Sequence, residues 1–140
     1  MIILDASFLV KLVLEEECSS EAENVLKSLI EAGERISTID IALSEVLNAL
    51  WKHYILIKDI DKGMLKGAVK DLLDLWEKIG KIHTGELATK ALNLAMKHRV
   101  TVYDSLYIAA ALKYRAGLAT YDSKQREIAA KCNVNTYPQL

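Results

Sequence analysis

Two kinds of hydrophobic pattern alternate along the chain. Short apolar runs are separated by longer segments in which apolar residues recur every three or four positions. The first pattern is typical of buried strands and the second of amphipathic helices. The apolar runs predict strands at 1–5, 35–39, 81–84, 117–121 and 134–137. The periodic segments predict helices at 7–17, 19–33, 40–57, 61–80, 85–99, 104–114 and 123–132.

Local signals sharpen the expected helix ends. Ser19 and Ser20 stand where a helix cap belongs, and Gly33 and Gly80 stand where helices stop. Strands that alternate with helices indicate a parallel sheet with helices on both faces. We expect one domain over residues 1–140 with this α/β architecture. In such open sheets, ligands bind beyond the carboxyl ends of the strands.

Two acidic residues fall at predicted strand ends. Asp5 ends the first strand and Asp122 follows the fourth. Each has a structural alternative, because Asp is a favoured N-cap and Asp122 has a capping-box spacing to Gln125. Ser7 could share the capping task beside Asp5. Thr120 precedes Asp122 by two positions, which places the two side chains on the same side of an extended strand.

Two further acids lie on predicted helices. Asp104 opens an alanine-rich helix, where capping alone would explain it. Glu45 shares a helical stripe with Asn48 and Lys52, a pattern typical of a solvated face. Apolar neighbours of Glu45 suggest a half-buried edge instead. No single acid is specific, but four carboxylates held together require cations, and hard oxygen ligands select Mg²⁺ or Mn²⁺.

Four segments together resemble the PIN-domain proteins, and more narrowly the toxin half of VapBC-type toxin–antitoxin pairs. They are "ILDASFLV", "LSEVLNAL", "VTVYDSLYIAAA" and "LATYDSKQREIA". Their order and spacing match the family's four-acid pattern across nearly the whole chain. The resemblance implies a PIN-like three-layer α/β/α domain with a short central parallel sheet of about five strands.

The resemblance also implies a function. Asp5, Glu45, Asp104 and Asp122 would bind Mg²⁺ or Mn²⁺ and hydrolyse RNA phosphodiester bonds. Ser7 and Thr120 fall where the family often carries a small hydroxyl residue near the site. The implied partners are an RNA substrate, a cognate antitoxin and a second copy of the chain in a homodimer. Lys52 is our preferred contact to the RNA backbone, since it follows Glu45 by about two helical turns.

Composition limits the remaining classes. The chain is 51% apolar, carries 18 basic and 19 acidic residues, and has two cysteines without C-x-x-C spacing. Setting the four acids aside leaves a basic excess, so net charge does not exclude a nucleic-acid substrate. The pattern contains no signal peptide or membrane-spanning run, and isolated thiols are typical of a reducing compartment, so we expect a cytoplasmic protein.

Two alternatives remain at this stage. A non-catalytic PIN-like module that binds RNA or protein would use the same acids only as helix caps, and divalent-ion binding would separate it from a nuclease. A phosphate-accepting switch domain also carries acids at strand ends. It is disfavoured because no lysine ends a suitable final strand and Glu45 would have no task.

Overall fold

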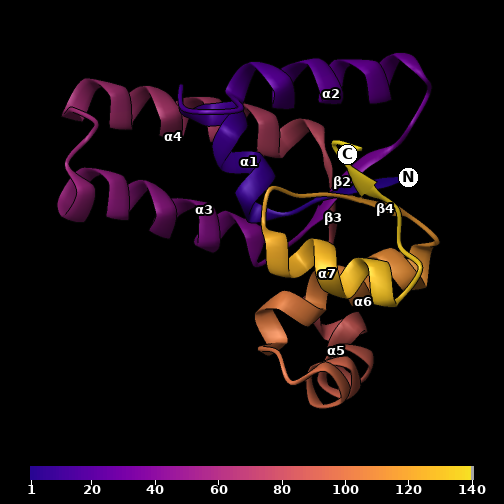
Figure 1. Ribbon diagram of the computed structural model, residues 1–140. Coiled ribbons are helices and arrows are strands. Elements are labelled where there is room, and N and C mark those ends of the chain that lie inside the picture. The colour runs from indigo at the N-terminus through magenta and orange to yellow at the C-terminus, as the bar shows by residue number, and fades with distance from the viewer. Residues whose placement is uncertain (140) are drawn as a thin grey trace.

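The computed structural model describes residues 1–139 and contains a five-stranded parallel sheet (Figure 1). Its strands are β1 (Ile2–Leu4), β2 (Ile36–Ile39), β3 (Gly80–Ile82), β4 (Gly117–Ala119) and β5 (Thr136–Tyr137). The helices are α1 (Ala6–Val13), α2 (Ser19–Glu31), α3 (Ala42–Trp51), α4 (Lys62–Lys78), α5 (Thr84–His98), α6 (Val102–Tyr114) and α7 (Ser123–Lys131), with a π-helix η1 (Lys52–Ile57) between α3 and α4. The predicted alternation of strands and helices is confirmed.

Strand order places the first strand beside the fourth. The order is β3-β2-β1-β4-β5, so the first strand lies at the centre of the sheet. Leu4 is paired with Ala119 at the carboxyl ends of β1 and β4. The amide of Asp5 then donates to the carbonyl of Ala119 at 3.1 Å. The residues that follow β1 and β4 are therefore neighbours, although they are far apart in sequence.

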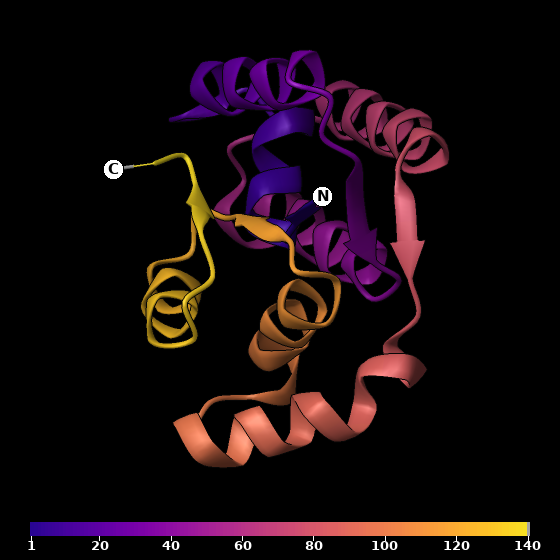
Figure 2. The same ribbon diagram turned by 90° about the vertical axis from the view of Figure 1, so that its right-hand side faces the viewer.

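Helices cover both faces of the sheet. Figure 2 shows α1, α2 and α4 on one side and α5, α6 and α7 on the other. Helix α6 packs on β1, β2 and β4. Its central residues from Leu106 to Ala111 are buried, and three consecutive alanines let the helix backbone approach the sheet closely. This packing fixes the direction of α6 and hence the place of its first turn.

Several helix boundaries differ from the sequence prediction. The first helix ends at Val13, because the Ser19 hydroxyl donates to the Leu14 carbonyl at 2.7 Å and stabilises a turn there. Ser19 is thus the first residue of α2 rather than its cap, and Cys18 occupies the N-cap position. Gly80 does not close α4 but begins β3, where a Cβ atom would lie 2.5 Å from the Ser37 hydroxyl.

Two more boundaries bear on the site. Helix α6 begins at Val102 rather than at Asp104, because Thr101 is its N-cap. The helix predicted at 40–57 is present as α3 but continues as the π-helix η1 from Lys52.

Among residues 1–139, no helix has the length and apolar character needed to cross a membrane.

Candidate functional site

Asp5 lies at the centre of a buried polar cluster at the carboxyl ends of β1 and β4. It is the N-cap of α1 and only 2% exposed. Its Oδ1 accepts hydrogen bonds from the Phe8 amide at 2.9 Å and from the Ser7 hydroxyl at 2.6 Å. Its Oδ2 accepts one from the Thr120 hydroxyl. The Asp5 carboxylate therefore caps α1 and also belongs to a polar cluster.

The two hydroxyl groups link Asp5 to the segment after β4. The Ser7 oxygen accepts a hydrogen bond from the Tyr121 amide at 2.9 Å. The Thr120 oxygen accepts one from the Asp122 amide at 3.0 Å. Each hydroxyl thus donates to Asp5 and accepts from a backbone amide of the segment after β4. This arrangement holds the Asp5 carboxylate and the backbone of Asp122 in a fixed relation.

Asp122 caps the last helix but does not form a complete capping box. Its Oδ1 accepts from the amides of Lys124 and Gln125, at 2.8 and 3.1 Å. The Gln125 side chain does not return to the Asp122 amide, because its Nε2 donates to the backbone carbonyl of Asp104 at 3.0 Å. Gln125 therefore joins the first turn of α7 to the first turn of α6.

Asp104 and Glu45 both lie in first helical turns and are half-buried. The Asp104 amide, rather than its carboxylate, takes part in the cap, since it donates to the Thr101 hydroxyl at 3.3 Å. Glu45 Oε1 accepts a hydrogen bond of 2.6 Å from the Tyr107 hydroxyl. The half-buried edge expected for Glu45 is confirmed, with its stripe neighbours Asn48 and Lys52 exposed.

Two of the carboxylates at this edge, Asp5 and Glu45, have raised pKa values. Burial raises the pKa of Asp5 to about 6, against the opposing hydrogen bonds of Ser7, Thr120 and Phe8, and the charge of Asp122 adds to the increase. Burial also raises the pKa of Glu45, where the hydrogen bond from Tyr107 opposes the shift and the charge of Asp104 reinforces it. The edge therefore carries excess negative charge.

The sequence-predicted residues are brought together in two groups. Asp5, Ser7, Thr120 and Asp122 form the first, and Glu45 with Asp104 the second. Within residues 1–139, no three side chains of His, Cys, Asp or Glu are arranged as ligands of one metal ion. Convergence of all four acids on a shared ion thus stays a prediction. Lys52 is exposed at the start of η1, and its RNA contact also stays a prediction.

The chemistry of these side chains fits a hard divalent cation. The donors are carboxylate and hydroxyl oxygens, which are the ligands that Mg²⁺ and Mn²⁺ prefer. Gln125 adds a second observation. Its side chain is 3% exposed, and its Oε1 has no hydrogen-bond partner among the described residues. A buried acceptor beside the acids is suited to a donor such as a water molecule held by the ion.

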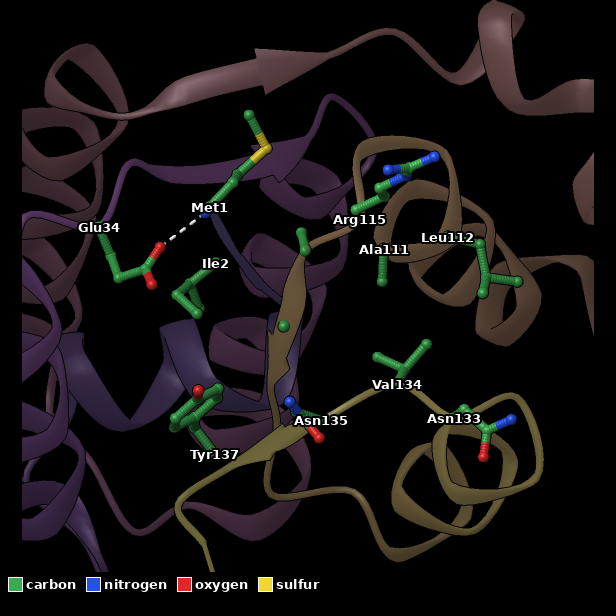
Figure 3. A pocket seen from close by; sticks show the side chains of 12 residues that line it. Met1, Ile2, Glu34, Ala111, Leu112, Arg115, Asn133, Val134, Asn135 and Tyr137 are labelled. Atoms are coloured by element: carbon green, nitrogen blue, oxygen red, sulfur yellow. Dashed lines mark hydrogen bonds and ion pairs between the residues drawn. The ribbon is translucent and has the colours of Figure 1, made fainter.

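A pocket elsewhere in the molecule is separate from these acids. A cavity of about 400 Å³ lies at the amino ends of β1 and β4. Its lining includes Met1, Ile2, Glu34 and Arg115 (Figure 3). The amino group of Met1 donates to Glu34 Oε2 at 2.6 Å within it. The acids follow the carboxyl ends of the same strands. The pocket and the acids therefore lie at opposite ends of β1 and β4.

Tyr107 and Gln125 are polar partners that sequence reasoning missed. The sequence presents Tyr107 as one of several apolar positions in α6, and the structure buries it there. A signal was available, since Tyr107 follows Asp104 by three positions and so lies on the same side of the helix. No local signal identifies the cross-helix bond of Gln125, because that bond depends on how α6 and α7 pack.

Comparisons with known proteins identify relatives of the whole chain. The family model described as PIN domain matches residues 2–131. The chain is 37% identical over 131 residues to Ribonuclease VapC3 of Pyrobaculum aerophilum, covering 90% of this chain and 92% of that protein.

Solved structures share the fold. PAE2754 from Pyrobaculum aerophilum superposes with a TM-score of 0.71 at 23% identity, covering 96% of this chain and 81% of that one. VapBC2 from Rickettsia felis, solved bound to a DNA fragment from their promoter, superposes with a TM-score of 0.60 at 20% identity and 97% coverage of both chains. The predicted PIN-like α/β fold is confirmed, and the chain belongs to the PIN domain family.

Proposed function

We propose that this protein is a Mg²⁺- or Mn²⁺-dependent endoribonuclease and the toxin of a type II toxin–antitoxin pair. The observation that carries the proposal is the edge of the sheet where β1 and β4 end. There a buried Asp5, with its pKa raised to about 6, lies near a second carboxylate and is held by two hydroxyl groups. The relative named Ribonuclease VapC3 supports the choice of RNA as the substrate class.

The four acids have distinct proposed roles. Asp5, Asp104 and Asp122 are the preferred direct ligands of the ion, because the ends of β1 and β4 and the rigid start of α6 position them. Glu45 binds the ion or orients the attacking water. Ser7 and Thr120 hold the Asp5 carboxylate in place and neutralise part of its charge by hydrogen bonding.

The reaction is hydrolysis of an RNA phosphodiester bond. A bound divalent ion would supply Lewis-acid chemistry, polarising the phosphate and lowering the pKa of a coordinated water. The acids of this chain would hold the positive ion beside the phosphate, where negative charge develops during attack at phosphorus. Lys52 contacts the RNA backbone, which positions the strand without reading its sequence.

Exposed apolar side chains support a protein partner. The segment formed by α3, η1 and the start of α4 exposes large apolar side chains over 40% or more of their area, namely Leu47, Trp51, Ile55, Leu56, Ile57 and Met64. Contiguous exposed apolar surface is typical of interaction sites. The VapBC2 structure supports a cognate antitoxin as one such partner, and a second copy of the chain is our proposal for another.

The proposed activity is tested by cleavage of an RNA whose two ends are blocked. We expect the wild-type protein to cut it internally with Mn²⁺ and to leave it intact with a chelator. Asp104→Asn should abolish cleavage by removing a ligand charge while preserving size. Asp71→Asn, an exposed position on α4, is the matched control and should cut like wild type.

Two outcomes would reject this function. Equal cleavage by wild type and Asp104→Asn would remove the acids from the mechanism. Wild-type protein that binds the RNA but never cuts it, with or without divalent ions, would favour a non-catalytic RNA-binding module.

A further inference from the structure

Tyr107 is a buried polar side chain to which the proposed mechanism gives no task. It lies in the middle of α6, one turn after Asp104, and is 2% exposed. Its hydroxyl donates to Glu45 Oε1 at 2.6 Å, which joins two residues that are 62 positions apart. The bond connects the helix on the sheet, α6, to the helix that follows β2, α3.

Packing alone does not explain the hydroxyl group. A phenylalanine would fill the same space without placing a polar atom in the interior, where an unpaired hydroxyl costs free energy. The phenol is the side-chain hydrogen-bond donor that the structure gives to the Glu45 carboxylate. That carboxylate is carried by a flexible side chain on the edge of a half-buried helix, so without the phenol it could rotate into solvent.

Orientation matters at this position. A carboxylate that binds an ion or orients water must be held to within about 0.5 Å, and the side chains behind it perform this task. A short hydrogen bond from a donor fixed in the core meets that requirement. Tyr107 is fixed because α6 packs directly on the sheet.

We propose that Tyr107 is a positioning residue that holds the Glu45 carboxylate at the acidic edge for ion binding and RNA cleavage. This inference rests on the proposed nuclease function, which gives Glu45 its role. Tyr107 acts through Glu45 and does not itself touch the RNA.

The test is a double-mutant cycle with two readouts. Tyr107→Phe, Glu45→Gln and the double variant are compared with wild type for Mn²⁺ affinity by calorimetry and for kcat and KM in RNA cleavage. Tyr107→Phe should weaken Mn²⁺ binding by about tenfold, as expected when the group supporting a ligand is lost. It should lower kcat with KM for RNA unchanged, and it should have no further effect once Glu45 is already Gln.

Tyr114→Phe is the matched control. Tyr114 lies on the same helix and donates its hydroxyl to Glu86, but it is 37% exposed and lies at the far end of α6. Its loss should leave Mn²⁺ affinity and cleavage unchanged. Urea unfolding of every variant shows which are folded at the assay temperature. If Tyr107→Phe is unfolded there, the cycle is repeated at a lower temperature.

The outcomes separate the two proposals. Wild-type behaviour of Tyr107→Phe, with an active wild type, overturns the positioning role and leaves the nuclease intact. Equal losses in the wild-type and Glu45→Gln backgrounds would also overturn it, since a purely structural hydroxyl acts independently of Glu45. A wild-type protein that neither binds Mn²⁺ nor cuts RNA would overturn both proposals.

Discussion

At the residue scale, the acid cluster combines capping with site chemistry. Asp5 and Asp122 both cap helices, as the simpler interpretation of the sequence predicts. Asp5 nonetheless sits in a place that a cap alone does not require, fully buried beside hydroxyls from two strand ends. The sequence contains the signal for the cap. The depth of burial depends on neighbours more than 100 positions away, so local patterns could not supply it.

The raised pKa of Asp5 has a consequence for stability. Burial raises that pKa from 3.8 to about 6 in the folded protein. The metal-free fold therefore binds the proton more tightly than the unfolded chain does. This contribution to stability is present in full below about pH 3.8 and is lost as pH rises through about 6.

Asp5→Asn should remove this pH dependence. Relative to wild type, the variant should gain stability between about pH 4 and about pH 7, by up to about 3 kcal/mol. Urea unfolding in a chelator across this range measures the difference. A difference that stays flat, or that favours wild type as pH rises, would show that Asp5 is not destabilised in its ionised form.

Thr120→Val tests the hydroxyl that supports Asp5. The substitution keeps the shape but leaves Asp5 Oδ2 and the Asp122 amide each short of a partner, at a cost of about 1–3 kcal/mol. It should also weaken Mn²⁺ binding. Thr38→Val is the control, because Thr38 is equally buried and donates to the Leu4 carbonyl at 2.6 Å.

The two threonine variants are compared by urea unfolding and by Mn²⁺ calorimetry. Both should lose stability, and only Thr120→Val should lose affinity for the ion. Equal Mn²⁺ affinity in the two variants would remove Thr120 from the site and leave it a structural residue.

At the scale of elements, the spacing of hydrophobic residues predicted nearly every helix and strand. The ends of these elements depended instead on contacts with other parts of the fold. Gly80 shows the reason. It is a plausible helix stop, but close packing of β3 on β2 places it in a strand. Likewise Thr101, one of several polar residues before α6, is its cap, so that Asp104 is free to direct its carboxylate elsewhere.

Several helices end on a non-glycine residue with positive φ. Arg99 after α5 has φ 53°, a left-handed conformation that costs an L side chain free energy. Arg99→Gly should raise stability by about 0.5–1 kcal/mol without changing cleavage, since the proposed site gives the Arg99 side chain no role. Thermal and urea unfolding measure the change.

Lys97→Gly is the control for Arg99→Gly. It removes the same charge from an exposed position inside α5, where glycine should cost about 1 kcal/mol. A loss of stability in both variants would contradict the proposed strain at Arg99.

At the scale of the whole molecule, strand order creates the site. Because β1 lies between β2 and β4, the ends of the first and fourth strands meet, and Asp5 meets Thr120 across 115 positions. The sequence predicted a parallel sheet and the acids at its strand ends. It did not contain the strand order, which follows from how the helices pack on the two faces. The prediction that the four acids share one site came from the family resemblance, since physical reasoning on each acid left capping as an alternative.

The central claim is that Asp5, Glu45, Asp104 and Asp122 form one divalent-ion site. The most direct measurement is thermal unfolding with and without Mn²⁺ for wild type, for the Asn or Gln variant at each acid, and for Asp71→Asn as control. An ion that binds only the folded state at about 100 times its dissociation constant adds about 2.7 kcal/mol. Wild type and Asp71→Asn should show this stabilisation, and all four site variants should lose most of it. Wild-type protein that ignores Mn²⁺, or site variants that respond to it like wild type, would contradict the account.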